Sequence, residues 1–452
     1  MNVPTTLAPV TSMMNRLFGS WLSTLNGMLV GCAIASCLST TSHAHDIIPG
    51  KPQTQPVVIQ HATLHVGNGS VIENGSVLFR RGKIVSVGAS VAIPGDAMLV
   101  DASGQHVYPG LIDAYTDLGL REITAVDVTV DNVERGELNP NVRSWVAFNP
   151  DSELIPVARS GGVLMAHVVP GGRLLQGQSG VLQLDGWSAR DMLLSGPAGM
   201  CINWDSLVPR GGDTKENAKR YNDEIRELDE LLERARRYAE QDRDGAGFQS
   251  DVRLESLVPV IEGKLPVFVQ ADRLAAIDSA ISFFTSRQIP MVLCGGADAM
   301  HCVDRLTAHD IPVILIATYR LPRRRHDAVD ALYSLPAKLR DAGVRFAIAG
   351  EGAGYPGGAS NVRNLPYHAG VAVAHGLPHE EAVRAITQSP AEILGIADRV
   401  GSLAAERDAT LILVDGDVLE TGSRVVGAYV QGRKVDLSNK HKQLYHKYEA
   451  KP

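Results

Sequence analysis

The sequence predicts an α/β protein: a (β/α)8 TIM-like barrel plus a small β-sandwich formed by both ends of the mature chain. Two observations carry this prediction. Short strands with alternating apolar residues fill 57–107 and return in 398–437, while 108–397 alternates apolar segments with amphipathic ones. The length of 452 residues suits one large domain and a smaller one, because single hydrophobic cores stop growing below that size.

Residues 1–44 are expected to be a cleaved signal peptide. Arg16 is the only charged residue in this segment and precedes a long uncharged stretch. Ser42 and Ala44 then occupy the −3 and −1 positions of a small-residue cleavage site. As an alternative, "LVGC" resembles a bacterial lipoprotein box, which would leave a lipid anchor on Cys32. Both interpretations place the protein outside the cytoplasm, in the periplasm or anchored as a lipoprotein.

Composition excludes some classes of partner and scaffold. The formal net charge of −7 gives no electrostatic bias toward nucleic acid. The short basic run at 323–325 is expected to be a solvated loop face, with an anion contact as the alternative. Removal of the signal peptide leaves Cys201, Cys294 and Cys302. Three cysteines cannot all pair, so the sequence does not predict a fold held together by disulfides.

The two ends of the mature chain, 57–107 and 398–437, both show short strand patterns with alternating apolar residues, unlike the segment between them. "SVLFRRGKIVSVG" predicts a hairpin that turns at Arg81-Gly82, and "RVVGAYVQGRKVDL" predicts one that turns at Gln431-Gly432. We therefore expect both ends to build one composite β-sandwich.

The middle, 108–397, is expected to form the barrel. Its apolar segments are short and apolar throughout, as strands buried on both faces should be. A doubly wound open sheet is the alternative, but no Gly-rich dinucleotide loop follows an early strand. The expected strands are "VYPGLID", "GVLMAHVV", "GVLQLD", "LPVFVQ", "IPMVLC", "IPVILI" and "VRFAIAG", and helices are expected at 272–287, 298–309 and 327–341.

One long charged segment, 213–245, predicts a helix with a single apolar stripe. A surface helix that packs this stripe on the barrel is the simplest interpretation, and an oligomer contact is the alternative. The stripe consists of Tyr221, Ile225, Leu228, Leu231, Leu232, Ala235 and Tyr238.

Three motifs carry a resemblance to a known family. "YPGLIDA" follows the β-rich start, "ARSGGVLMAHVVPGGRLLQGQSGVLQLDGW" lies in the barrel, and "SPAEILGIADRVGSLAAERDATLILVDGD" lies near the end. In this order they resemble the amidohydrolase superfamily, especially its imidazolonepropionase-like branch, over nearly the whole mature chain. The resemblance implies hydrolysis of carbon–nitrogen bonds in amides and cyclic amides, by a water that one or two divalent ions activate.

The resemblance also implies where the metal ligands should be, and the pattern is degenerate here. The superfamily uses His-x-His after the first strand, a mid-barrel Lys, two further His residues and an Asp at the last strand. The corresponding residues of this chain are Tyr115 and Asp117, Cys201, Gln270 and Cys294, and Glu351.

These side chains are poor replacements for imidazole. A Gln carbonyl is a weak neutral ligand, and a Tyr binds a divalent ion only as phenolate, against a reference pKa of about 10. No metal or other cofactor is therefore expected. The alternative is a rewired zinc site that uses Asp117, Glu351 and a thiolate.

Other motifs have ordinary interpretations. His167 and His301 are expected to be satisfied core or surface residues. The Gly-rich stretch "GEGAGYPGGASNVRN" is expected to be a mobile loop at the barrel mouth, with ligand contact through Arg363 or Asn364 as the alternative.

Two functions remain open from the sequence. One is an exported amidohydrolase-family hydrolase that acts on non-peptide or cyclic amide carbon–nitrogen bonds with an altered or absent metal centre. The other is a non-catalytic pseudoenzyme that acts as a binding or assembly partner of an active paralogue. The expected partners are a small-molecule ligand or substrate and a second barrel, either a copy of this chain or a paralogue, and nucleic acid is not expected.

Overall fold

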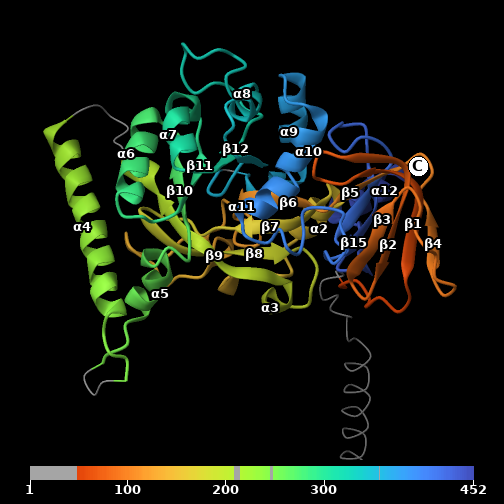
Figure 1. The fold of residues 1–452 in the computed structure, drawn as a ribbon, viewed down its shortest axis with the longest axis horizontal. Helices are drawn as coiled ribbons and strands as arrows, with labels where there is room; N and C mark the ends of the chain where they lie inside the picture. Colours follow the sequence, from red (N-terminus) through yellow and green to blue (C-terminus); the bar gives the residue numbers. More distant parts are fainter. Residues whose placement is uncertain (1–47, 208–213, 245–247, 356, 452) are drawn as a thin grey trace, which may run out of the picture. The chain divides into compact units, whose positions relative to one another are not determined.

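The computed structural model describes residues 48–207, 214–244, 248–355 and 357–451 (Figure 1). The expected signal peptide, its cleavage site and Cys32 lie outside these residues. Among the helices of the described ranges, none is both long enough and apolar enough to cross a membrane.

Strands from both ends of the chain share one eight-stranded mixed sheet, in the order β16-β15-β14-β5-β1-β2-β3 with β4 beside β1. Strand β14 pairs antiparallel with β5, so hydrogen bonds join the C-terminal strands to the N-terminal ones. The further prediction that this region is a sandwich stays a prediction. The strands are β1 Val57–His65, β2 Val71–Arg80, β3 Lys83–Gly88, β4 Met98–Asp101, β5 His106–Pro109, β14 Leu411–Val414, β15 Val425–Val430 and β16 Arg433–Lys434.

Both predicted hairpin turns are confirmed. Arg81 and Gly82 join β2 to β3 with φ of 52° and 79°, and Gln431 and Gly432 join β15 to β16 with φ of 48° and 73°. Positive φ at both central residues matches the twist of the flanking strands, which is why such turns favour hairpins.

The middle of the chain forms the predicted barrel, in the order β13-β12-β11-β10-β9-β8-β7-β6. Strand β13 lies against β6, so the ring is nearly closed. The strands are β6 Leu111–Thr116, β7 Val163–Val168, β8 Leu175–Gln183, β9 Leu193–Asn203, β10 Val267–Ala271, β11 Met291–Gly295, β12 Val313–Ile316 and β13 Phe346–Ala349.

One part of the barrel departs from simple strand–helix repetition. Strands β7, β8 and β9 pair antiparallel, while β9 to β13 are all parallel. Only the four-residue helix α3 (Ala189–Met192) lies between β8 and β9. A parallel crossover needs a dozen or more residues, so this short connection allows only an antiparallel return.

Helices pack against the barrel strands β10, β11 and β13 (Figure 1). The expected helix at 327–341 begins only at Leu335, because Pro336 suits a first turn and the preceding residues form turns. The remaining α-helices are α2 Leu154–Ser160, α4 Lys215–Ala239, α5 Val252–Ile261, α6 Leu274–Thr285, α7 Val303–Ala308, α8 Leu335–Asp341, α9 Leu365–Ala374, α10 His379–Ala385, α11 Gln388–Ile393 and α12 Lys440–Glu449. Short 3-10 turns are η1 Asp127–Thr129, η2 Ser144–Val146, η3 Trp204–Ser206, η4 Ala299–Cys302 and η5 Ala359–Asn364.

The predicted stripe of the long helix is largely buried. Helix α4 packs against α5, and Tyr221 and Ile225 at its N-terminal end are only partly covered. The prediction of a helix that packs one face on the protein is confirmed, and its oligomer alternative stays untested. The buried residues are Leu228, Leu231, Leu232, Ala235 and Tyr238.

A buried ion network connects the barrel to the sheet that both ends of the chain form, here called the terminal sheet. The carboxylate of Asp185, fully buried after β8, accepts hydrogen bonds from Arg159 Nη1 at 3.2 Å and from Arg433 Nε at 3.1 Å. The backbone N–H of Gly50 donates to the same carboxylate. Residues from both ends of the chain therefore meet on one barrel carboxylate.

The barrel interior is a packed core of buried side chains. The Phe268 ring is fully buried and lies so close to Gly199 that a Cβ at position 199 would overlap it. The interior also contains Ile112, Met165, Cys201, Val292, Cys294, Ile314 and Ala347.

We expect Gly199→Ala to lower the free energy of unfolding by about 1–3 kcal/mol, because the added methyl group overpacks the barrel against Phe268. Chemical denaturation measures the change. Gly95→Ala is the matched control, since a Cβ there meets nothing within 4 Å, and it should stay within about 0.5 kcal/mol of wild type. Equal stability of the two variants would contradict a filled barrel.

Candidate active site at the barrel mouth

A cavity of about 870 Å³ lies at the carboxyl ends of the barrel strands. Its volume suits a small molecule, and this end of the barrel is where TIM-barrel enzymes place their active sites. Barrel strands and the residues that immediately follow them contribute Tyr115, Asn203, Gln270, Gly295, Ile316 and Glu351 to the wall.

Tyr115 occupies the first ligand position and lines the cavity while almost fully buried. Its hydroxyl donates to Gln270 Oε1 at 3.5 Å, and its ring meets the His167 ring edge to face. Burial, together with the neighbouring Cys294, raises the pKa of Tyr115 well above its usual value of 10. The phenol therefore stays neutral and does not supply a phenolate ligand.

Asp117 lies behind the cavity wall and is fully buried. Its Oδ2 accepts from Gly354 N at 3.0 Å and from Asn132 Nδ2 at 3.1 Å, and it lies 3.4 Å from Arg121 Nε. Burial raises the pKa of Asp117, while these contacts oppose the rise. Its visible role is to hold three wall-forming segments together.

The two thiols at ligand positions also lie away from the cavity. Cys201 and Cys294 are fully buried in the barrel interior. Burial raises the pKa of Cys201 to about 12 and that of Cys294 well above its usual value. Strand register pairs Cys201 with Phe268 and pairs Asn203 with Gln270, so Asn203 is the β9 residue that reaches the mouth. The placement of Cys201 as a pocket residue was therefore wrong.

Gln270 and Glu351 line the cavity. Glu351 Oε2 accepts a hydrogen bond from Asn361 Nδ2 at 2.9 Å, which orients the carboxylate from the loop after β13. Of the predicted positions, the structure thus brings Tyr115, Gln270 and Glu351 to one cavity and places Asp117, Cys201 and Cys294 behind it.

The residues at the mouth do not fit the superfamily's metal centre. A neutral phenol, an amide and one carboxylate lack the imidazoles that hold zinc at such sites. Within the described ranges, a group of at least three His, Cys, Asp or Glu ligand atoms lying within 4.8 Å of one another occurs at His65, His379 and Glu380, which do not line this cavity.

Sequence reasoning missed the charge of the cavity wall. Five arginines line it against three carboxylates. Arg320 Nε is buried without a hydrogen-bond partner in the described structure, and its guanidinium lies 3.7 Å from Asp272 Oδ2. The run at 323–325 is exposed, as expected, and Arg323 also lines the cavity and pairs with Asp272. The wall residues are Arg121, Arg173, Arg220, Arg320, Arg323, Asp205, Asp272 and Glu351.

Two of these carboxylates are adjacent. The Asp272 backbone N–H donates to both oxygens of the Asp205 carboxylate, at 3.3 and 3.2 Å. Burial, and next the charge of Asp272, raises the pKa of Asp205 above its usual value. Among the wall carboxylates, burial therefore favours the protonated form of Asp205, and shifted pKa values are common among groups at functional sites.

The lone histidines of the barrel are structural. His167 is bonded on both ring nitrogens, to Ala114 O and Ser179 Oγ at 2.7 Å each, and burial lowers its pKa to about 4. Burial likewise lowers the pKa of His368 to about 4, and its Nδ1 accepts from Tyr319 N. The expected structural role of His167 is confirmed.

The Gly-rich stretch contacts the cavity through residues other than those proposed. Ala353, Gly354 and Tyr355 line the wall. Arg363 instead bonds His441 of helix α12 at 3.1 Å, and neither it nor Asn364 reaches the cavity. The suggested ligand contact through Arg363 or Asn364 was wrong.

Comparisons with known proteins agree on one family. The model of the Amidohydrolase family matches residues 286–435. Amidohydrolase tasK of Hapsidospora irregularis is 24% identical over 403 residues, which cover 79% of this chain and only 39% of that protein. Imidazolonepropionase of Mesorhizobium japonicum is 25% identical over 378 residues, covering 76% of this chain and 87% of that protein. In structure, an amidohydrolase from Thermotoga maritima has a TM-score of 0.74 at 24% identity, covering 84% and 99% of the two chains.

We expect Cys201 and Cys294 to resist thiol reagents in the native protein, because both are buried thiols with raised pKa values. Labelling at pH 8 followed by residue-resolved mass spectrometry measures this. Both should react within minutes in guanidinium chloride, which serves as the control. Rapid labelling of either residue in the native state would show an accessible thiolate and revive the rewired metal site.

Proposed function

Since the chain belongs to the amidohydrolase superfamily, in its imidazolonepropionase-like branch, we propose that it hydrolyses a carbon–nitrogen bond of an anionic amide without the usual metal ligands. The family match and the hydrolase relatives support a hydrolase-like function. The observation that carries the proposal is the cavity wall, where five arginines face three carboxylates. Export to the periplasm through residues 1–44 is part of the same proposal.

The arginines favour an anionic substrate. A guanidinium presents a planar set of donors that matches a carboxylate or phosphate group, and such charge-assisted bonds are among the strong ones. Arg320 has an unpartnered Nε, and Asp272 pairs with both Arg320 and Arg323, so this side of the wall has donors to spare. A carboxylate on the substrate would accept hydrogen bonds from these arginine N–H groups.

The remaining wall groups suit the steps of amide hydrolysis. The Glu351 carboxylate takes a proton from a water whose oxygen bonds to the carbonyl carbon, and arginine charge stabilises the resulting oxyanion. The carbon–nitrogen bond then breaks, and the Asp205 carboxyl gives its proton to the departing nitrogen. Proton exchange with solvent returns Glu351 to its ionised form and Asp205 to its protonated form.

A second candidate is a non-catalytic binding protein, alone or assembled with a second copy or an active paralogue. The observation that favours it is that buried packing groups fill former ligand positions, including Cys201 and Cys294. Both candidates use the same anion-binding cavity, and they differ only in turnover.

We expect Arg320→Gln to weaken binding of an anionic probe, N-acetylglutamate, by roughly 10-fold or more, because it removes a charge-assisted donor. Isothermal titration calorimetry measures the affinity. The control is Arg345→Gln, which removes an arginine paired with Asp310 outside the cavity and should leave binding unchanged. Equal affinities in the two variants would remove the basis for an anionic ligand.

We expect turnover on a panel of cyclic amides and N-acyl amino acids to survive a chelator. Glu351→Gln and Asp205→Asn should each reduce kcat by about 100-fold or more, since each removes a proton-transfer group. Probe affinity separates loss of catalysis from loss of folding. Probe binding without any turnover in the wild type would favour the binding protein, and turnover that a chelator abolishes would contradict metal-free hydrolysis.

A further inference from the structure

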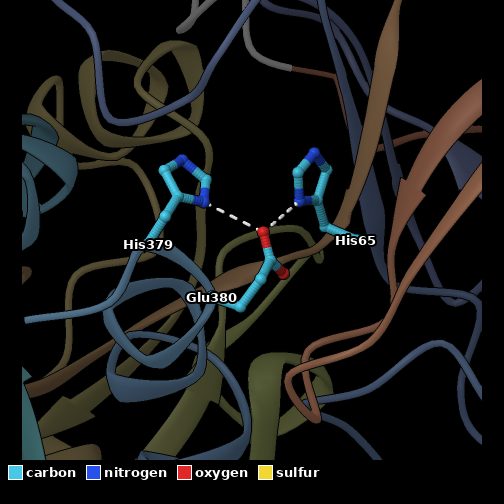
Figure 2. A group of neighbouring side chains, drawn as sticks. All are labelled: His65, His379 and Glu380. Atoms are coloured by element: carbon cyan, nitrogen blue, oxygen red, sulfur yellow. Dashed lines mark hydrogen bonds and ion pairs between the residues drawn. The ribbon is translucent and has the colours of Figure 1, made fainter.

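Three potential metal ligands converge outside the barrel mouth. His65 ends strand β1, and His379 and Glu380 begin helix α10. Both histidine rings point at the Glu380 carboxylate (Figure 2). Glu380 Oε1 lies 2.8 Å from His65 Nδ1 and 2.9 Å from His379 Nδ1. We infer that these three residues form a binding site for a divalent transition-metal ion of the zinc type, where the terminal sheet meets the barrel.

The donor set has the right chemistry for such an ion. Two imidazoles and one carboxylate are a common protein ligand set for zinc and leave a fourth position for water. The three ligand atoms all lie within 4.8 Å of one another. A tetrahedral ion at roughly 2.0–2.1 Å from each ligand needs the ligand atoms about 3.4 Å apart. The two His–Glu contacts of 2.8 and 2.9 Å are about 0.5 Å shorter than that, so the Glu380 carboxylate must move away from both histidines to admit the ion.

One oxygen of the cluster lacks a protein partner. Glu380 Oε2 is buried and accepts no hydrogen bond within the described structure. A buried carboxylate oxygen without a donor is uncommon, because its desolvation is not offset. A cation held between the two histidines would offset it.

The residues behind the ligands complete the arrangement. His379 Nε2 lies 2.7 Å from Asp417 Oδ2, and His65 Nε2 lies 3.0 Å from His106 Nδ1. The His65 ring also stacks on Tyr108, with centroids 4.2 Å apart. Metal-binding histidines usually have a bonded second nitrogen, most often bonded to a carboxylate, because that contact fixes the ring orientation.

The competing explanation is an ion network without a metal, in which protons link the two histidines to Glu380 and Asp417. A metal ion would displace the protons of the two Nδ1···Oε1 hydrogen bonds, so binding should release protons.

The test is calorimetric titration of the chelator-treated full chain with Zn²⁺, in two buffers of different ionisation enthalpy. We expect one ion per chain with proton release. His379→Ala and Glu380→Gln should each weaken binding by more than 100-fold, and Asp417→Asn by roughly 10–100-fold, as for other residues that orient a ligand. Thermal unfolding of each variant checks that it is folded.

Two control variants separate this site from others. Glu351→Gln at the barrel mouth and His301→Ala on η4 should bind Zn²⁺ as the wild type does. Absence of stoichiometric binding by the wild type, or unchanged binding by folded His379→Ala and Asp417→Asn, would overturn the metal site in favour of the proton-held network. Loss of binding in Glu351→Gln would place the ion at the mouth and overturn it equally.

Discussion

The architecture depends on the need to fill a closed barrel. Eight strands enclose a space that is only wide enough for side chains, so every inward position must contribute volume. In this chain Phe268, Cys201 and Cys294 supply that volume, and Tyr115 closes the top with a hydrogen bond to Gln270. The core thus extends up to positions where the superfamily would hold metal ions.

Because packing side chains fill the barrel up to the ends of its strands, the charged groups of the cavity stand on the loops that follow the strands. The arginines of the cavity wall come from separate segments, among them the loop after β6, the loop after β12 and helix α4. Asp117 joins Gly354, Asn132 and Arg121 through one buried carboxylate, so the wall is held in place from behind. The cavity is consequently defined by the charged side chains of these loops, which lie above the packed interior of the barrel.

Local patterns in the sequence predicted much of the fold and less of the site. The turn at Arg81-Gly82 and the stripe of α4 follow from spacing over a few residues, and the structure contains both. The antiparallel pairing of β8 with β9 was not predicted. The apolar content of a segment indicates a strand but not its direction, which here follows from the short connection between the two strands. The cluster at His65 and Glu380 joins residues 315 positions apart, and only the His-Glu pair at the start of α10 gave a local signal.

The pairing of β14 with β5 has a consequence for how the chain acquires its structure. Leu411 lies opposite Pro109, so nearly the whole barrel sequence separates two neighbouring strands. A chain that emerges from its N-terminus holds β5 without this neighbour until almost all of it has been synthesised. Contacts of such sequence separation slow folding. The strands of 411–434 therefore complete a sheet that 57–109 begins, and this sheet cannot be completed before the barrel sequence between them has emerged.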